Sequence, residues 1–135
     1  MSDLPSGLSG QVADPEEVAR AIMSSSWFAP TTGRIKHNTY LPAPDDDTSV
    51  FRMTGLDRAG VQTLLAEHRV TEHGAAVAAV ISVREARLDV IASEPPLSHA
   101  NIRGWPKSAD PEEQKSKRKE IAICIAEAAR RVPWV

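Results

Sequence analysis

The chain has 135 residues, of which 41% are hydrophobic and 25% charged, and its formal net charge is −2. This length and composition are typical of one globular domain, which can bury enough apolar surface to fold without disulfides. The slightly acidic balance argues against a dedicated nucleic-acid-binding protein, because such proteins usually present a strongly basic face.

Cysteine content and hydropathy bear on the cellular compartment. The single cysteine, Cys124, cannot form an intrachain disulfide, and we expect its thiol to be buried on the apolar face of the last helix. No apolar run approaches the roughly 18 residues that a membrane-spanning helix needs, and residues 1–11 do not resemble a secretory signal. We therefore expect a cytoplasmic protein that makes no membrane contact.

The N-terminal residues 1–13 are rich in Ser, Gly and Pro, and we expect them to form a flexible arm before one domain at 14–135. The domain opens on Asp14-Pro15-Glu16-Glu17, which has the capping aspartate, the first-turn proline and the returning glutamate of a helix start. A short helix that ends near Ser24–Ser26 is therefore predicted. Its apolar face would consist of Val18, Ala19, Ile22 and Met23.

The next segments predict two strands and a helix. Thr48–Thr54 has strand character, and Arg34–Leu41 is expected to pair with it across the acidic turn Asp45–Asp47. Asp57 can cap a helix over Arg58–Arg69. The buried face of this helix would consist of Val61, Leu64 and Leu65.

The second half of the chain predicts a hairpin and a long helix. The continuous apolar run Ala75–Val83 is typical of a buried strand, and the short link to Leu88–Ala92 favours an antiparallel hairpin. A second Asp-Pro-Glu-Glu at Asp110–Glu113 opens the last helix. Its apolar stripe consists of Ile121, Cys124, Ile125, Ala128 and Val132. The predicted fold is α+β, a single domain with a mostly antiparallel sheet of about four strands and the long C-terminal helix packed on it.

The best candidate site is the loop Glu94–Pro106, which carries large polar and aromatic side chains that a connection does not require. His99 is the leading candidate, because histidine titrates near neutral pH and can act as acid, base or ligand. The alternative role for His99 is to fix the loop by hydrogen bonds to backbone carbonyls. Asn101 could orient a ligand, and Trp105 is either an interface anchor or a packing residue.

Arg52 and Arg103 complete the predicted binding set. Arg52 lies in the strand around Val50–Met53, with Val50 on its own side of the alternation. A guanidinium on a sheet face can grip a carboxylate or phosphate with two hydrogen bonds, and the alternative is a solvent-facing side chain.

Several kinds of site lack the required spacing. The four histidines are not arranged as zinc ligands and no Cys-x-x-Cys is present, so we expect neither a metal nor a cofactor. The chain has no Gly-x-Ser-x-Gly, phosphate loop or dinucleotide fingerprint. Ser98 and His99 are not predicted to form a catalytic pair, because neighbours in an extended chain point apart.

Three segments resemble a group of small bacterial proteins that are described only as uncharacterised. They are Ser49-Val50-Phe51-Arg52, His73-Gly74-Ala75 and Pro96-x-x-His99-Ala100-Asn101-Ile102-x-Gly104-Trp105-Pro106, and the likeness extends over most of the chain from Val18 onward. The resemblance implies a bacterial origin and a stand-alone domain. It implies no activity, cofactor or catalytic residue.

Three functional hypotheses follow. The favoured one is an accessory or binding subunit that acts with a protein partner from the same bacterial system, with Trp and Arg as interface anchors. The second is a small enzyme or sensor for a phosphorylated or nucleotide-like ligand, in which His99 is the acid or base and Arg52 and Arg103 hold anionic oxygens. The third is weak nucleic-acid contact through Lys115–Lys119, which the acidic balance of the chain disfavours.

Overall fold

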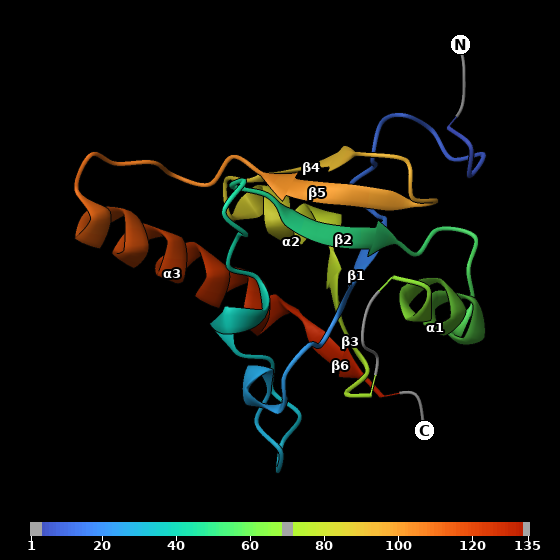
Figure 1. The fold of residues 1–135 in the computed structure, drawn as a ribbon, viewed down its shortest axis with the longest axis horizontal. Coiled ribbons are helices and arrows are strands. Elements are labelled where there is room, and N and C mark those ends of the chain that lie inside the picture. The colour runs from blue at the N-terminus through green and yellow to red at the C-terminus, as the bar shows by residue number, and fades with distance from the viewer. Residues whose placement is uncertain (1–3, 69–71, 134–135) are drawn as a thin grey trace.

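The computed structural model describes residues 4–68 and 72–133. They form an α+β fold with one antiparallel sheet in the order β4-β5-β2-β1-β3-β6 and a long C-terminal helix (Figure 1). The predicted fold class is therefore confirmed, but the expected strand number was wrong, because the sheet has six strands instead of about four. The strands are β1 (Glu17–Ala21), β2 (Thr48–Arg52), β3 (Ala75–Ala79), β4 (Asp89–Ala92), β5 (His99–Arg103) and β6 (Arg130–Val132). The helices are α1 (Arg58–Ala66), α2 (Val80–Glu85) and α3 (Pro111–Ala128), with short 3-10 turns η1 (Ser25–Trp27) and η2 (His37–Thr39).

The helix predicted after Asp14 was wrong, since Glu17–Ala21 is a central strand of the sheet. β1 pairs with β2 on one side and with β3 on the other, and apolar clusters on both faces of the sheet bury its small apolar residues. The Glu16 carboxylate does accept a hydrogen bond from Ala13 N at 2.7 Å, which resembles the contact of a glutamate in a helix capping box. Its carboxylate also binds Arg52 of β2, and the pairing of β1 within the sheet overrides the local capping signal.

The hairpin predicted between Ala75–Val83 and Leu88–Ala92 was also wrong. The apolar run divides into β3 and the helix α2, and β3 pairs with β1 and β6 while β4 pairs with β5. At the junction Val80 N donates to Glu16 O and Ile81 N to Asp14 O, at 2.9 and 3.1 Å. These bonds turn the chain away from the sheet at the start of α2. The apolar sequence of Ala75–Val83 does not indicate them, because their acceptors lie far away in the sequence.

β5 occupies part of the segment that we expected to be a loop, and it replaces Arg34–Leu41 as a neighbour of β2. Arg34–Leu41 instead holds the turn η2 and one isolated bridge between Ile35 and Phe28. The Pro-rich stretch hid the alternation of β5, in which Ala100 and Ile102 are fully buried between more polar neighbours. A strand with only two apolar residues gives a weak periodic signal.

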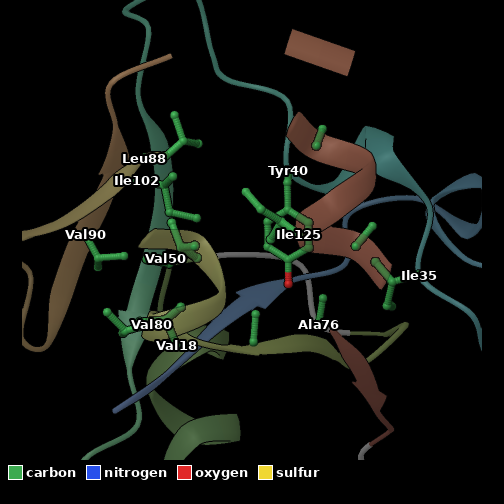
Figure 2. Packing of buried hydrophobic residues seen from close by; sticks show 14 of the residues in the cluster. Val18, Ile35, Tyr40, Val50, Ala76, Val80, Leu88, Val90, Ile102 and Ile125 are labelled. Atoms are coloured by element: carbon green, nitrogen blue, oxygen red, sulfur yellow. The ribbon is translucent and has the colours of Figure 1, made fainter. Parts of the chain in front are cut away.

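Two apolar clusters lie on opposite faces of the sheet. The larger packs α2 and α3 on one face, with Tyr40 and Ile125 at its centre (Figure 2). The smaller packs α1 on the other face, where Val61 and Leu65 are buried as predicted and Asp57 caps the helix through Gly60 N at 2.7 Å. The predicted burial of Cys124 was wrong: its thiol is exposed, and the buried stripe of α3 is Ala122, Ile125 and Ala126.

A buried ion pair joins the N-terminal segment to the sheet. The guanidinium of Arg52, only 1% exposed, grips the Glu16 carboxylate with bonds of 2.8 and 2.9 Å, and its third nitrogen donates to Ser9 O at 2.7 Å. Ser9 and the buried Val12 belong to the segment expected to be a flexible arm. Burial raises the pKa of Glu16, but the hydrogen bonds from Arg52, Ala13 and Thr54 outweigh it, so the net pKa lies below the ordinary value.

We predict that Glu16→Gln lowers the free energy of unfolding at about pH 7 by about 2 kcal/mol, because Arg52 loses its charged partner inside the fold. Since the folded-state pKa of Glu16 is depressed, its stabilisation is complete above the unfolded value and is lost as the pH falls through the folded value. The variant should therefore lose less stability than the native chain when the pH is lowered from about 6 to about 3. Urea denaturation across this range measures both effects.

The exposed Glu120 gives a matched control, because Glu120→Gln removes the same charge from the surface of α3. Its stability should follow that of the native chain at every pH. An acid-unfolding curve for Glu16→Gln that is parallel to the native one would contradict a stabilising pair.

Candidate functional site

The candidate site is a cleft of about 490 Å³ on the sheet face that also packs α1. It lies over β2 and β5, beside the turn that precedes β2, and these strands are neighbours near the middle of Figure 1. Its lining mixes apolar side chains with hydroxyl, imidazole, amide and carboxylate groups. The lining residues are Arg20, Ala21, Met23, Ala43, Asp45, Asp47, Ser49, Phe51, His99 and Asn101.

The pairing of β2 with β5 places the polar groups together. Ser49 lies opposite Asn101 and Phe51 lies opposite His99 in an antiparallel register. Residues opposite each other, and residues two apart along a strand, share one face of a sheet. Four side chains of the cleft therefore come from two adjacent strands, which hold them more rigidly than a mobile loop would.

The imidazole of His99 is held at both nitrogens. Nδ1 lies 2.9 Å from Ser93 O, and Nε2 lies 2.6 Å from Ser49 Oγ. A backbone carbonyl only accepts hydrogen bonds, so Nδ1 carries the proton of the neutral ring. Nε2 then keeps its lone pair and accepts the hydroxyl proton of Ser49, the arrangement of a base beside a nucleophile or proton donor.

Aromatic contacts fix the plane of the same ring. The ring of Phe51 meets His99 edge-on at a centroid distance of 5.3 Å, and His68 stacks on Phe51 at 5.7 Å. Phe51 is itself buried against α1 through the smaller apolar cluster. The imidazole thus keeps one orientation toward the cleft, and the apolar packing under α1 supports it.

The wall opposite the strands is acidic. Asp45 and Asp47 line the cleft, and Asp47 Oδ1 lies 3.0 Å from Arg103 Nε at its rim. Asn101 is 8% exposed, and its side chain makes no hydrogen bond with another described residue. It therefore offers both a donor and an acceptor to a ligand.

Arg20 also lines the cleft. The ladder between β1 and β2 stops at Ala19, and beyond it the guanidinium donates to Ser49 O at 2.6 Å and to Thr39 O at 2.5 Å. It also lies over the ring of Trp27, 5.4 Å from its centroid. These contacts make Arg20 a brace for β2 near the site.

The structure brings together some of the predicted site residues and separates others. His99 and Asn101 line the cleft and Arg103 stands at its rim. Arg52 lies on the opposite sheet face, held by Glu16, so it is neither solvent-facing nor near His99. Trp105 is 4% exposed within the larger apolar cluster, which makes it a packing residue.

The loop-fixing role considered for His99 occurs in the structure, because Nδ1 bonds the backbone carbonyl of Ser93. Its role as acid, base or ligand stays a prediction, and the other nitrogen faces Ser49. The sequence reasoning missed Ser49 and the carboxylates of the turn Asp45–Asp47 as site residues. The alternation in Thr48–Arg52 could have placed Ser49 on the face of Phe51. Only the pairing with β5 shows that His99 lies on that face as well.

Over residues 4–68 and 72–133 no three His, Cys, Asp or Glu side chains are grouped so that they could hold a metal ion. None of the helices there has the length and apolar character that crossing a bilayer requires.

Comparison with known proteins finds no matching family model, curated protein or solved structure.

The loop-fixing role of His99 predicts a difference between two variants. His99→Asn keeps an N–H at the position of Nδ1 and can still donate to Ser93 O, whereas His99→Ala cannot. Both lose the contact with Phe51 and the bond to Ser49. We expect His99→Asn to be more stable than His99→Ala by about 1 kcal/mol in urea denaturation. Equal stabilities would show that the bond to Ser93 does not hold the loop.

Proposed function

We propose that the protein is a small enzyme or sensor that binds a neutral or cationic polar molecule in the cleft between β2, β5 and the turn Asp45–Asp47. The observation that carries this proposal is the pair of contacts of His99, whose Nδ1 lies 2.9 Å from Ser93 O and whose Nε2 lies 2.6 Å from Ser49 Oγ inside the cleft. In this role His99 is a general base, and it takes the proton of Ser49 when the hydroxyl engages the ligand.

The charges of the cleft favour this ligand class over the phosphorylated one expected from the sequence. Arg52 binds Glu16 on the other face, Arg103 is paired with Asp47, and Arg20 of the cleft lining donates to the carbonyls of Thr39 and Ser49. Asp45, whose charge no described cation pairs, would repel an anion and attract an ammonium or amide N–H donor. Asn101 supplies the directional hydrogen bonds, and Met23, Ala43 and Phe51 provide apolar contact.

An accessory subunit that acts with a protein partner is the second candidate. Its support is the edge strand β4 and the loop after it, where Ile91 and Leu97 are exposed. An edge strand can pair with a strand of another chain. Trp105 gives this hypothesis no exposed anchor, because its side chain is buried. The ring of Trp27 packs against the guanidinium of Arg20.

The proposal includes a bacterial cytoplasmic setting. The exposed, unpaired thiol of Cys124 suits a reducing compartment, where such a group persists without oxidation. The resemblance of the Pro96–Pro106 pattern to small bacterial proteins supports the bacterial origin. Fractionation of a bacterial host that expresses the chain tests the location.

Three probes with one ring and different charge test the ligand class: benzylamine, benzamide and benzoate. We predict that benzylamine and benzamide shift the amide NMR signals of Ser49, His99 and Asn101, with a Kd on the order of 1 mM for benzylamine. Benzoate should leave these signals unchanged because of the acidic wall.

Neighbouring aspartates provide the matched control for the binding test. Asp45→Asn removes a charge from the cleft and should weaken benzylamine about threefold, the scale of an exposed ion pair. Asp46→Asn removes the same charge from the next residue, which binds Arg118 and Lys107 instead, and should leave benzylamine unaffected. Preferential binding of benzoate at Ser49 and His99 would contradict the proposal.

A further inference from the structure

A second hollow, of about 380 Å³, lies between the first turns of α3 and the segment around η2. Leu41, Pro42 and Pro111 give it apolar surface, and Gln114 adds an amide. All the ionisable side chains that line it are basic. They are His37, Lys115, Arg118 and Lys119. The polarity of this groove is therefore opposite to that of the cleft beside His99.

The lysines of the groove are not neutralised within the described part of the chain. Neither Lys115 nor Lys119 has an ion pair there, whereas Lys117, between them on α3, is paired with Glu113 at 2.8 Å. Of these three lysines of α3, Lys115 and Lys119 line the groove without an ion pair in the described residues. Lys117 is paired and does not line the groove.

Arg118 is held in place between them. Its Nε donates to Pro106 O at 2.9 Å, and its side chain is only 12% exposed. Nη2 lies 3.1 Å from Asp46 Oδ1, within ion-pair range, but this buried nitrogen has no hydrogen bond of good geometry with a described residue. Part of the capacity of the guanidinium to donate is therefore unused.

The groove also changes the titration of its histidine. Burial, followed by the positive charge of Lys119, lowers the pKa of His37 below its ordinary value. An anion placed between them would oppose the field of Lys119 and raise that pKa, which gives a local signal of occupancy.

We propose that this groove binds a small amphipathic anion, namely a carboxylate, sulfonate or phosphate attached to an apolar body. The anionic group would lie between Lys115, Lys119 and Arg118, and the apolar body would lie on Leu41 and the two prolines. Charge complementarity carries the choice of a small anion, because three cations converge on a hollow whose lining contains no carboxylate in the described residues. This site is separate from the cleft of the proposed function and does not depend on it.

Asp46 is the internal competitor for this anion. It binds both Arg118 and Lys107, and the contact with Arg118 is the main influence that lowers the pKa of Asp46. Neutralising Asp46 would release the guanidinium for an added anion. Removing this carboxylate should therefore strengthen anion binding, whereas removing a lysine of the groove should weaken it.

Phenyl phosphate is the test probe, with inorganic phosphate as the headgroup alone and benzylamine as the cation. We expect phenyl phosphate to shift the amide signals of His37, Lys115 and Lys119 and to raise the pKa of His37 in an NMR titration. Inorganic phosphate should bind about tenfold more weakly, because it makes no contact with the apolar surface. Benzylamine should not shift these signals.

Four variants of the full chain locate the site. Arg118→Gln should weaken phenyl phosphate about tenfold and Lys119→Gln about threefold. Lys117→Gln removes the same charge from the same helix and should have no effect. Asp46→Asn should strengthen binding. Thermal unfolding of each variant tests whether it is folded. If Arg118→Gln does not fold, the opposite effects of Lys119→Gln and Asp46→Asn on the affinity for phenyl phosphate test the proposal.

Other outcomes would overturn the proposal. Equal losses from Lys117→Gln and Lys119→Gln would indicate diffuse attraction to α3. Equal affinity for phosphate and phenyl phosphate would remove the apolar surface from the site, and no binding would remove the site itself. Tighter binding of a single-stranded oligonucleotide, with the strong salt dependence of phosphate contacts, would replace a small anion with nucleic acid.

Discussion

The antiparallel register between β2 and β5 is the constraint on which the candidate site depends. It places Ser49 opposite Asn101 and Phe51 opposite His99, so that a hydroxyl, an imidazole and an amide share one face. Because side chains alternate along a strand, a slip of one residue would turn His99 and Asn101 into the apolar core and bring Ala100 and Ile102 out of it. The burial of Ala100 and Ile102 therefore fixes the orientation of the polar groups.

Charge is distributed so that the cleft beside His99 and the groove beside α3 have opposite polarity. The turn Asp45–Asp47 divides its carboxylates between them: Asp45 and Asp47 line the cleft beside His99, whereas Asp46 binds Arg118 on the side of α3. The same turn thus makes one hollow acidic and partly neutralises the basic groove. A single short segment contributes to both proposed sites, and its order depends on contacts with β5 and with α3.

The fold class and the strongest helices could be predicted from the sequence, because their signals are local. Asp57 caps α1, and the second Asp-Pro-Glu-Glu opens α3. The first Asp-Pro-Glu-Glu failed as a helix signal because Glu16 binds Arg52, which is distant in the sequence. The loop around His99 was identified from its composition, but Ser49 was missed, since no local pattern shows which strands become neighbours. The alternation of the strand correctly placed Arg52 on the same face as Val50. Its partner is Glu16 of the same chain and not a ligand.

The most direct test of the account is the protonation pattern of the His99 ring, measured by long-range proton–nitrogen NMR correlation at a pH where the imidazole is neutral. The account predicts a proton on Nδ1, bonded to Ser93 O, and an unprotonated Nε2 whose nitrogen signal changes in Ser49→Ala. A proton on Nε2 of the neutral ring would contradict it, because His99 could then accept no proton from Ser49 and the cleft would lose its base.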